Sequence, residues 1–109
     1  MSSSYAAVRK YTRYAVDVRA KVFVEDKEFT VRTVDVSEGG VGVVSPVEIP
    51  DGERVEVELV FPTMQDSFRA EVKAQSRNGF RYGFRFIGLD AEKLSLLQKF
   101  QRRWGIRAK

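Results

Sequence analysis

Hydrophobic and polar residues alternate with a period of two through most of this chain, and that period is typical of β-strands with one buried face. Over 16–24 every second residue is valine or alanine, and over 55–61 every second residue is valine, leucine or phenylalanine. The same alternation predicts further strands around 29–36, 68–74 and 80–86, and the apolar run 41–44 predicts a short buried strand. The hydrophobic parity changes after Val31, which predicts a β-bulge near Thr33.

Residues that favour turns separate the predicted strands. They predict a turn at Asp26 and Lys27, a break at Gly39 and Gly40, a loop over 45–53 and a turn over 62–65.

The dipeptide Asn78-Gly79 is the strongest hairpin signal in the chain, because a type I′ turn requires positive φ at both central positions. One face of the strand before it carries Phe68, Ala70, Val72 and Ala74. The strand after it carries four aromatic residues at alternate positions, which we expect in the core: Phe80, Tyr82, Phe84 and Phe86.

The last part of the chain changes to the spacing of an α-helix. Asp90 is a candidate N-cap, and Gly105 is expected to end the helix. Apolar residues recur between them at intervals of three or four, at Leu94, Leu97, Phe100 and Trp104. This stripe packs on the chain's own strands or on a partner, and the sequence leaves both possibilities open. We therefore predict an all-β fold, a six-stranded antiparallel β-barrel with a C-terminal amphipathic α-helix.

Composition narrows the function classes. The chain has 109 residues, which fits one compact domain. The absence of cysteine excludes disulfides and thiolate zinc sites, and the absence of histidine removes the commonest general base and metal ligand. We therefore predict a binding protein rather than an enzyme, with no metal and no cofactor. No apolar run has membrane-spanning length and no secretory signal is recognisable, so we expect a cytoplasmic protein without a membrane segment.

Acidic residues are confined to the middle of the chain, whereas basic residues dominate both ends. All 15 Asp and Glu residues lie between Asp17 and Glu92, together with only 10 of the 19 Lys and Arg residues. The remaining bases are Arg9, Lys10 and Arg13 on one side and Lys93, Lys99, Arg102, Arg103, Arg107 and Lys109 on the other. This distribution predicts that an anion binds at the ends, with solvated termini that keep the domain soluble as the alternative.

Two short motifs occur in an order that points to a family. The first is Arg9-x-x-x-Arg13, just before the first predicted strand, and the second is Asp35-x-Ser37-x-x-Gly40. Each is common by itself, since Asp and Ser before glycine often form a simple turn. With both motifs in this strand context, the chain resembles the PilZ domain family, which are bacterial receptors for the second messenger cyclic di-GMP. The resemblance implies a flexible N-terminal arm over 1–14, followed by a PilZ β-barrel with its C-terminal helix over 15–109.

The resemblance also implies which residues bind cyclic di-GMP, namely Arg9, Arg13, Asp35, Ser37 and Gly40. Guanidinium groups match the O6 and N7 acceptors of guanine and pair with phosphate oxygens in a bidentate manner. The side chains of Asp35 and Ser37 supply acceptors for the guanine N–H donors. Gly39 and Gly40 have no side chain and so let the backbone approach the ligand. Lys10 is a candidate phosphate contact, with a solvated lysine as the alternative.

Ligand binding is expected to fold the arm across the barrel and to create a new surface. We therefore predict a signal-transduction receptor or adaptor without catalytic groups. The resemblance implies that it controls motility, biofilm formation, exopolysaccharide production or virulence through a protein partner.

Three alternatives remain for the same sequence. A PilZ-like scaffold without ligand binding is the first, although both motifs are complete. A small nucleic-acid-binding barrel is the second, because 80–84 is superficially similar to RNA-recognition strands, but Arg81 stands where a small residue is required, so nucleic acid is not expected as a partner. An enzyme is the third, but Ser37 has neither a histidine nor a neighbouring lysine to activate it.

Overall fold

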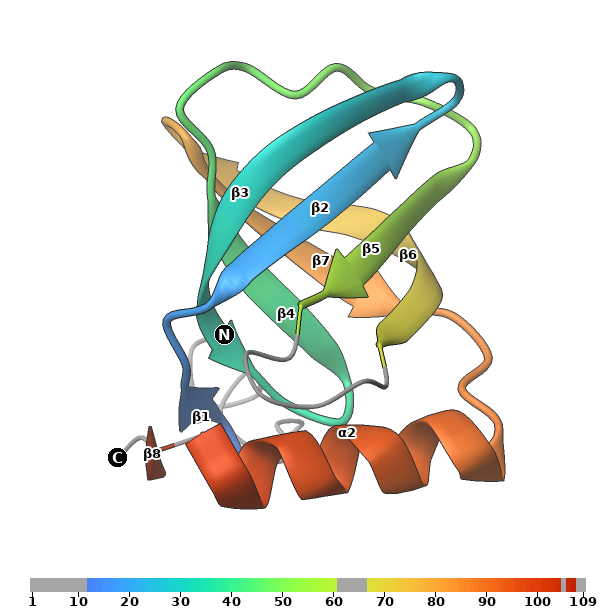
Figure 1. Cartoon of the computed structure of the whole chain (residues 1–109). Coiled ribbons are helices and arrows are strands. Elements are labelled where there is room, and N and C mark those ends of the chain that lie inside the picture. Colours follow the sequence, from blue (N-terminus) through green and yellow to red (C-terminus); the bar gives the residue numbers. More distant parts are fainter. Residues whose placement is uncertain (1–11, 61–66, 105, 108–109) are drawn as a thin grey trace, which may run out of the picture.

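The computed structural model describes residues 12–60, 67–104 and 106–107, and Figure 1 shows their arrangement. In chain order the elements are β1 (Tyr14–Ala15), β2 (Arg19–Val24), β3 (Lys27–Val36), β4 (Gly40–Val44), β5 (Val55–Leu59), β6 (Phe68–Asn78), β7 (Arg81–Phe86), α2 (Ala91–Trp104) and β8 (Ile106–Arg107). The turn predicted over 62–65 lies outside the described residues.

Six strands close into an antiparallel barrel, which confirms the predicted fold class. The strand order is β2-β5-β6-β7-β4-β3, and the additional pairing of β2 with β3 closes the ring. Two three-stranded meanders make up the barrel, β2-β3-β4 and β5-β6-β7, and they meet along the β2–β5 and β4–β7 ladders. The two-residue strands β1 and β8 were not predicted, and they extend the sheet beyond β3.

The core lies inside the barrel and under the helix that covers one of its ends (Figure 1). Alternate positions of the strands are buried, as the period of two predicts, and Phe68 packs edge-to-face on Phe86 with ring centroids 5.4 Å apart. Leu97 and Phe100 of α2 are fully buried in the same core, so this part of the helical stripe packs on the chain's own barrel. The N-cap is confirmed, because Asp90 Oδ1 accepts a 2.8 Å hydrogen bond from the Lys93 N–H.

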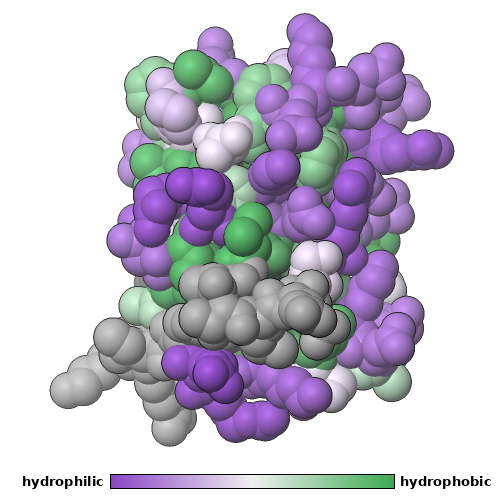
Figure 2. All heavy atoms as spheres, viewed as in Figure 1, coloured by the Kyte–Doolittle hydropathy of each residue, from purple (hydrophilic) through white to green (hydrophobic). Residues whose placement is uncertain are grey.

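The exterior is largely hydrophilic. Figure 2 shows hydrophilic side chains over most of the right half of one face, with hydrophobic residues visible in its middle and upper left. The four exposed large hydrophobic residues that the structure describes are Val44, Val47, Phe80 and Ile87.

The predicted β-bulge is present, and it explains why β2 begins later than the alternation over 16–24 predicts. The register of β3 against β4 shifts between Thr33 and Asp35. The Thr33 hydroxyl donates to the Val16 carbonyl and accepts a 3.0 Å hydrogen bond from the Val18 N–H. The buried Thr33 side chain therefore forms hydrogen bonds with backbone groups of Val16 and Val18. These residues lie outside the regular ladder, and β2 begins only at Arg19.

The predicted turn at Asp26 and Lys27 is wrong by one residue. Lys27 pairs with Val24 in the ladder, so the turn consists of Glu25 and Asp26. Glu25 adopts a positive φ of 54°, which is unusual for a residue with a side chain. Its carboxylate accepts hydrogen bonds from the N–H groups of Glu53 (2.8 Å) and Arg54 (3.1 Å), and these contacts hold the turn in place.

The type I′ turn predicted at Asn78-Gly79 is also wrong, and so is the core position predicted for Phe80. Asn78 pairs with Arg81, so the two turn residues are Gly79 and Phe80, and of these only Gly79 has a positive φ. Phe80 is 54% exposed because it lies at the tip of the hairpin. The register of β6 against β7 shifts between Ala74 and Ser76, which moves the turn and leaves Ala74 exposed.

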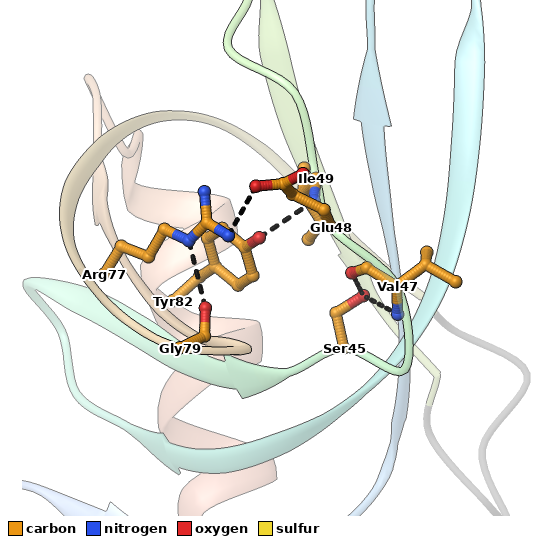
Figure 3. Close-up of polar contacts among 7 residues, drawn as sticks. All are labelled: Ser45, Val47, Glu48, Ile49, Arg77, Gly79 and Tyr82. Carbon is orange, nitrogen blue, oxygen red and sulfur yellow. Dashed lines mark hydrogen bonds and ion pairs between the residues drawn. The ribbon is translucent and has the colours of Figure 1, made fainter.

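This hairpin holds the β4–β5 loop by polar contacts (Figure 3). Arg77 donates to Glu48 at 2.7 Å and to the Gly79 carbonyl at 3.0 Å, and the hydrogen bond to Glu48 raises the pKa of the Arg77 guanidinium. The buried Tyr82 hydroxyl accepts a 2.9 Å hydrogen bond from the Ile49 N–H. The loop between the two meanders is therefore held by an exposed contact to β6 and a buried contact to β7.

The Tyr82→Phe variant is expected to be less stable by about 1–3 kcal/mol, because it leaves the buried Ile49 N–H without its acceptor. Denaturant unfolding measures the change. Val47→Ala, at an exposed position of the same loop, is the control and is expected to change stability by less than about 0.5 kcal/mol. Equal stability of Tyr82→Phe and the parent protein would contradict this prediction.

Candidate functional site

Asp35 is the centre of a cluster of charged groups on the outside of the barrel. Its side chain is only 15% exposed, and its Oδ2 atom lies 3.0 Å from Nη2 of Arg13 and 3.8 Å from Nη2 of Arg81. Two guanidinium groups from different parts of the chain therefore converge on one carboxylate oxygen.

Gly42 makes room for this carboxylate. Asp35 and Gly42 are partners in the β3–β4 ladder, and a Cβ atom at position 42 would lie 2.7 Å from Asp35 Oδ1. Any side chain at this position would push the carboxylate away from β4. Gly42 is thus part of the site although it offers no functional group of its own.

The short strand β1 places Arg13 beside Asp35. Tyr14 pairs with Val36 and Ala15 pairs with Asp35, and on its other side β1 pairs with β8. The ladder therefore fixes the backbone next to Arg13, whose side chain stays 38% exposed. The ion pair between Arg13 and Asp35 follows from this pairing of segments that are distant in sequence.

Ser37 organises the turn that follows β3. Its Oγ atom accepts hydrogen bonds from the N–H groups of Gly39 (3.1 Å) and Gly40 (3.2 Å), and its own N–H donates to the Gly40 carbonyl at 2.8 Å. Both hydroxyl lone pairs are used in this way, so Ser37 can offer a ligand its hydroxyl hydrogen rather than the acceptor that was expected from the sequence. A Cβ atom at Gly40 would collide with the Phe84 carbonyl oxygen, so the close approach of β4 to β7 requires glycine here.

The same turn is hydrogen-bonded to the C-terminal helix. Gln98 donates to Glu38 at 3.1 Å, and the buried Gln101 donates to the Val36 carbonyl at 3.4 Å. A cleft of about 450 Å³ lies between the turn and the start of α2, lined by Glu38, Gly39, Arg85, Phe86, Leu89 and Leu94. A change in the conformation of the turn would thus alter these hydrogen bonds to α2.

The structure brings together part of the predicted set. Arg13 and Asp35 are in contact, and Ser37, Gly39 and Gly40 form the adjoining turn. Arg9 and Lys10 lie outside the described residues.

Sequence reasoning missed Arg81 and Gly42. A second glycine two residues after Gly40 was a signal for Gly42, but Arg81 gave none, because its place depends on the long-range pairing of β4 with β7.

A larger groove of about 810 Å³ lies beside this cluster. Its walls come from 15–17, Arg19, 30–34 and 44–46, and they include Ala15, the ladder partner of Asp35. Most of its lining surface is apolar, although Asp17, Arg19 and Arg32 also border it, whereas a carboxylate and two guanidinium groups converge at Asp35. We therefore place the candidate site at the charged cluster.

The described residues contain neither a metal-binding cluster of acidic side chains nor a membrane-spanning helix. Within 12–60, 67–104 and 106–107 there is no group of three or more acidic residues placed to hold a metal ion. In that same part of the chain, α2 is neither long enough nor apolar enough to cross a membrane.

A family model described as the PilZ domain matches residues 7–102. Among solved structures, the chain is similar to the PilZ domain of YcgR from Escherichia coli with c-di-GMP (22% identity, TM-score 0.64, covering 84% of this chain and 87% of that one). It is also similar to the Bacillus subtilis inhibitor of motility MotI/DgrA (21% identity, TM-score 0.61, covering 87% of this chain and 50% of that one).

An uncharacterized protein of Aquifex aeolicus (strain VF5) is 24% identical over 100 residues, which cover 89% of this chain and 49% of that protein. The chain thus spans about half the length of the curated relative that it matches. At these identities the solved structures support the barrel fold.

Proposed function

Because the chain belongs to the PilZ domain family, we propose that it is a receptor for cyclic di-GMP and that it passes the signal to a protein partner. The observation that carries this proposal is the Asp35 carboxylate, which is held between Arg13 and Arg81 and followed by the Ser37 turn. The PilZ domain of YcgR, which has the same fold, was solved with c-di-GMP, and this similarity supports the same ligand class here.

The groups around Asp35 are complementary to the parts of a guanine dinucleotide. A carboxylate can accept from N1–H and N2–H of guanine at once, whereas guanidinium groups donate to O6, N7 or phosphate oxygens. Arg13 is the group that a base must share with Asp35 or displace, since the two side chains are in direct contact. Arg9 and Lys10 precede Arg13 by a few residues and supply further positive charge for the two phosphates.

In this proposal, ligand binding is transmitted to the C-terminal helix as a change of its contacts. The Ser37 turn is tied to α2 through Glu38–Gln98 and Val36–Gln101, so ordering of the turn by a ligand would change the contacts of the helix. MotI/DgrA is an inhibitor of motility, and we propose for this chain a cytoplasmic adaptor role in motility, biofilm formation, exopolysaccharide production or virulence. The burial of Tyr82 and Phe84 argues against the nucleic-acid alternative, because these rings are not available for base stacking.

Calorimetric titration with cyclic di-GMP tests the proposal. We expect saturable binding by the wild-type protein and no comparable binding of cyclic di-AMP. The double variant Arg9→Ala/Arg13→Ala is expected to bind at least about 100-fold more weakly, since it loses two charged donors worth about 1.5–3 kcal/mol each.

A matched control removes the same net charge elsewhere. Lys99→Ala/Arg102→Ala alters two exposed positions of α2, and we expect it to keep wild-type affinity. If the wild-type protein gave no heat up to high micromolar cyclic di-GMP, the scaffold alternative would replace the receptor proposal. Equal weakening by both double variants would mean that only net charge matters and that Arg9 and Arg13 form no specific site.

A further inference from the structure

Arg81 reaches the Asp35 carboxylate from the opposite side to Arg13. Its Nη2 atom lies 3.8 Å from Asp35 Oδ2, which is beyond hydrogen-bond distance, and its side chain is 56% exposed. Among the described residues, the guanidinium is therefore close to the Asp35 carboxylate without a hydrogen bond to it, and its donors can serve another acceptor.

The strand order explains how Arg81 comes so close. Asp35 lies on β3 and Arg81 on β7, and β4 runs between them with Gly42 as the partner of both Asp35 and Gly83. Two glycines thus face each other on the sheet surface beside these side chains. The Asp35 carboxylate lies over Gly42 and so leans toward β7.

We propose that Arg81 is a specificity-determining residue that donates a hydrogen bond to O6 of the same guanine whose N1–H and N2–H bind Asp35. This inference rests on the proposed function and deepens it. The Watson–Crick edge of guanine presents the O6 acceptor next to the N1–H and N2–H donors. The Arg81 guanidinium would face the acceptor, and the neighbouring Asp35 carboxylate would face the two donors.

The same pair of side chains is unfavourable for adenine. Adenine presents its N6 amino donor where guanine has O6, and an N1 acceptor where guanine has N1–H. The amino group would then face the Arg81 guanidinium and the ring nitrogen would face the Asp35 carboxylate. A donor facing a donor and an acceptor facing an acceptor leave these polar groups unpaired, which weakens binding.

The test compares three cyclic dinucleotides with the wild-type protein and with Arg81→Ala. Cyclic di-GMP and cyclic di-IMP both carry O6, although inosine lacks the N2 amino group, and cyclic di-AMP carries an amino group instead of O6. We expect Arg81→Ala to weaken cyclic di-GMP and cyclic di-IMP by a common factor of about 10–100 and not to weaken cyclic di-AMP, measured by displacement of a fluorescent cyclic di-GMP. Arg81→Lys, which keeps a positive donor, is expected to recover part of the lost affinity.

Several results would overturn the inference. Equal weakening of all three ligands by Arg81→Ala would indicate a purely structural role, and affinity for cyclic di-GMP within threefold of wild type would remove Arg81 from the site. Arg54→Ala, an exposed arginine of the β4–β5 loop, is the control and is expected to leave all three affinities unchanged. Failure of the wild-type protein to bind cyclic di-GMP would overturn the proposed function together with this inference, whereas wild-type binding with an unaffected Arg81→Ala variant would overturn this inference alone.

Discussion

The Phe100→Ala variant is expected to lower the free energy of unfolding by about 3–5 kcal/mol, enough to remove a large part of the stability of a small domain. Phe100 has no exposed surface, and with Leu97 it joins α2 to the barrel core. Removal of the ring both loses buried apolar surface and leaves a cavity under the helix. The midpoint and slope of urea unfolding, followed by circular dichroism, measure the change.

Lys99→Ala is the matched control, because position 99 is exposed on the same helix, and its stability is expected to change by less than about 0.5 kcal/mol. A loss below about 1 kcal/mol for Phe100→Ala would mean that α2 is not held on the barrel in solution. That result would favour docking of the helical stripe on a partner, the possibility that the sequence left open.

The Asp35→Asn variant is expected to lose at least about 100-fold in affinity for cyclic di-GMP. The substitution keeps the shape of the side chain but replaces a charged acceptor of two N–H groups by an amide with a single acceptor atom. Loss of a charged hydrogen bond costs about 1.5–3 kcal/mol, and the amide N–H₂ adds a donor opposite the donors of the base. Calorimetric titration measures the effect directly.

Asp17→Asn provides a control with the same chemistry. Asp17 also forms an ion pair with an arginine, since its Oδ1 atom lies 2.7 Å from Nε of Arg32, but this pair is exposed and includes neither Arg13 nor Arg81. We expect the control to bind like the wild-type protein. Wild-type affinity of Asp35→Asn would show that the carboxylate is not the base-recognition group and would move the site elsewhere on the barrel.

Local patterns of the sequence predicted most of the fold. The alternation of apolar residues, the parity change near Thr33 and the N-cap at Asp90 each depend on neighbours a few residues away, and the structure confirms all three. The hairpin tip was harder, because the shift between Ala74 and Ser76 moves the turn by one residue and exposes Phe80. No property of Asn78-Gly79 itself reveals that shift.

The candidate site could be predicted only in part, for the same physical reason. The turn around Ser37 is local, and its glycines were identified from the motif. The contact of Arg81 with Asp35 requires β4 to lie between β3 and β7, and the position of Arg13 requires β1 to pair with β3. These pairings join segments far apart in sequence, which no short pattern encodes.

The two meanders also determine which strand pairings are local in sequence and which are not. Each consists of hairpins between consecutive strands, whereas the β2–β5 and β4–β7 ladders join distant segments and have the larger loop-closure cost. Asp35 belongs to the first meander and Arg81 to the second. A base bound by both residues would therefore connect the two meanders across the β4–β7 ladder. Such a ligand would oppose separation of the two meanders. The bound protein is therefore expected to unfold more slowly as well as to be more stable at equilibrium.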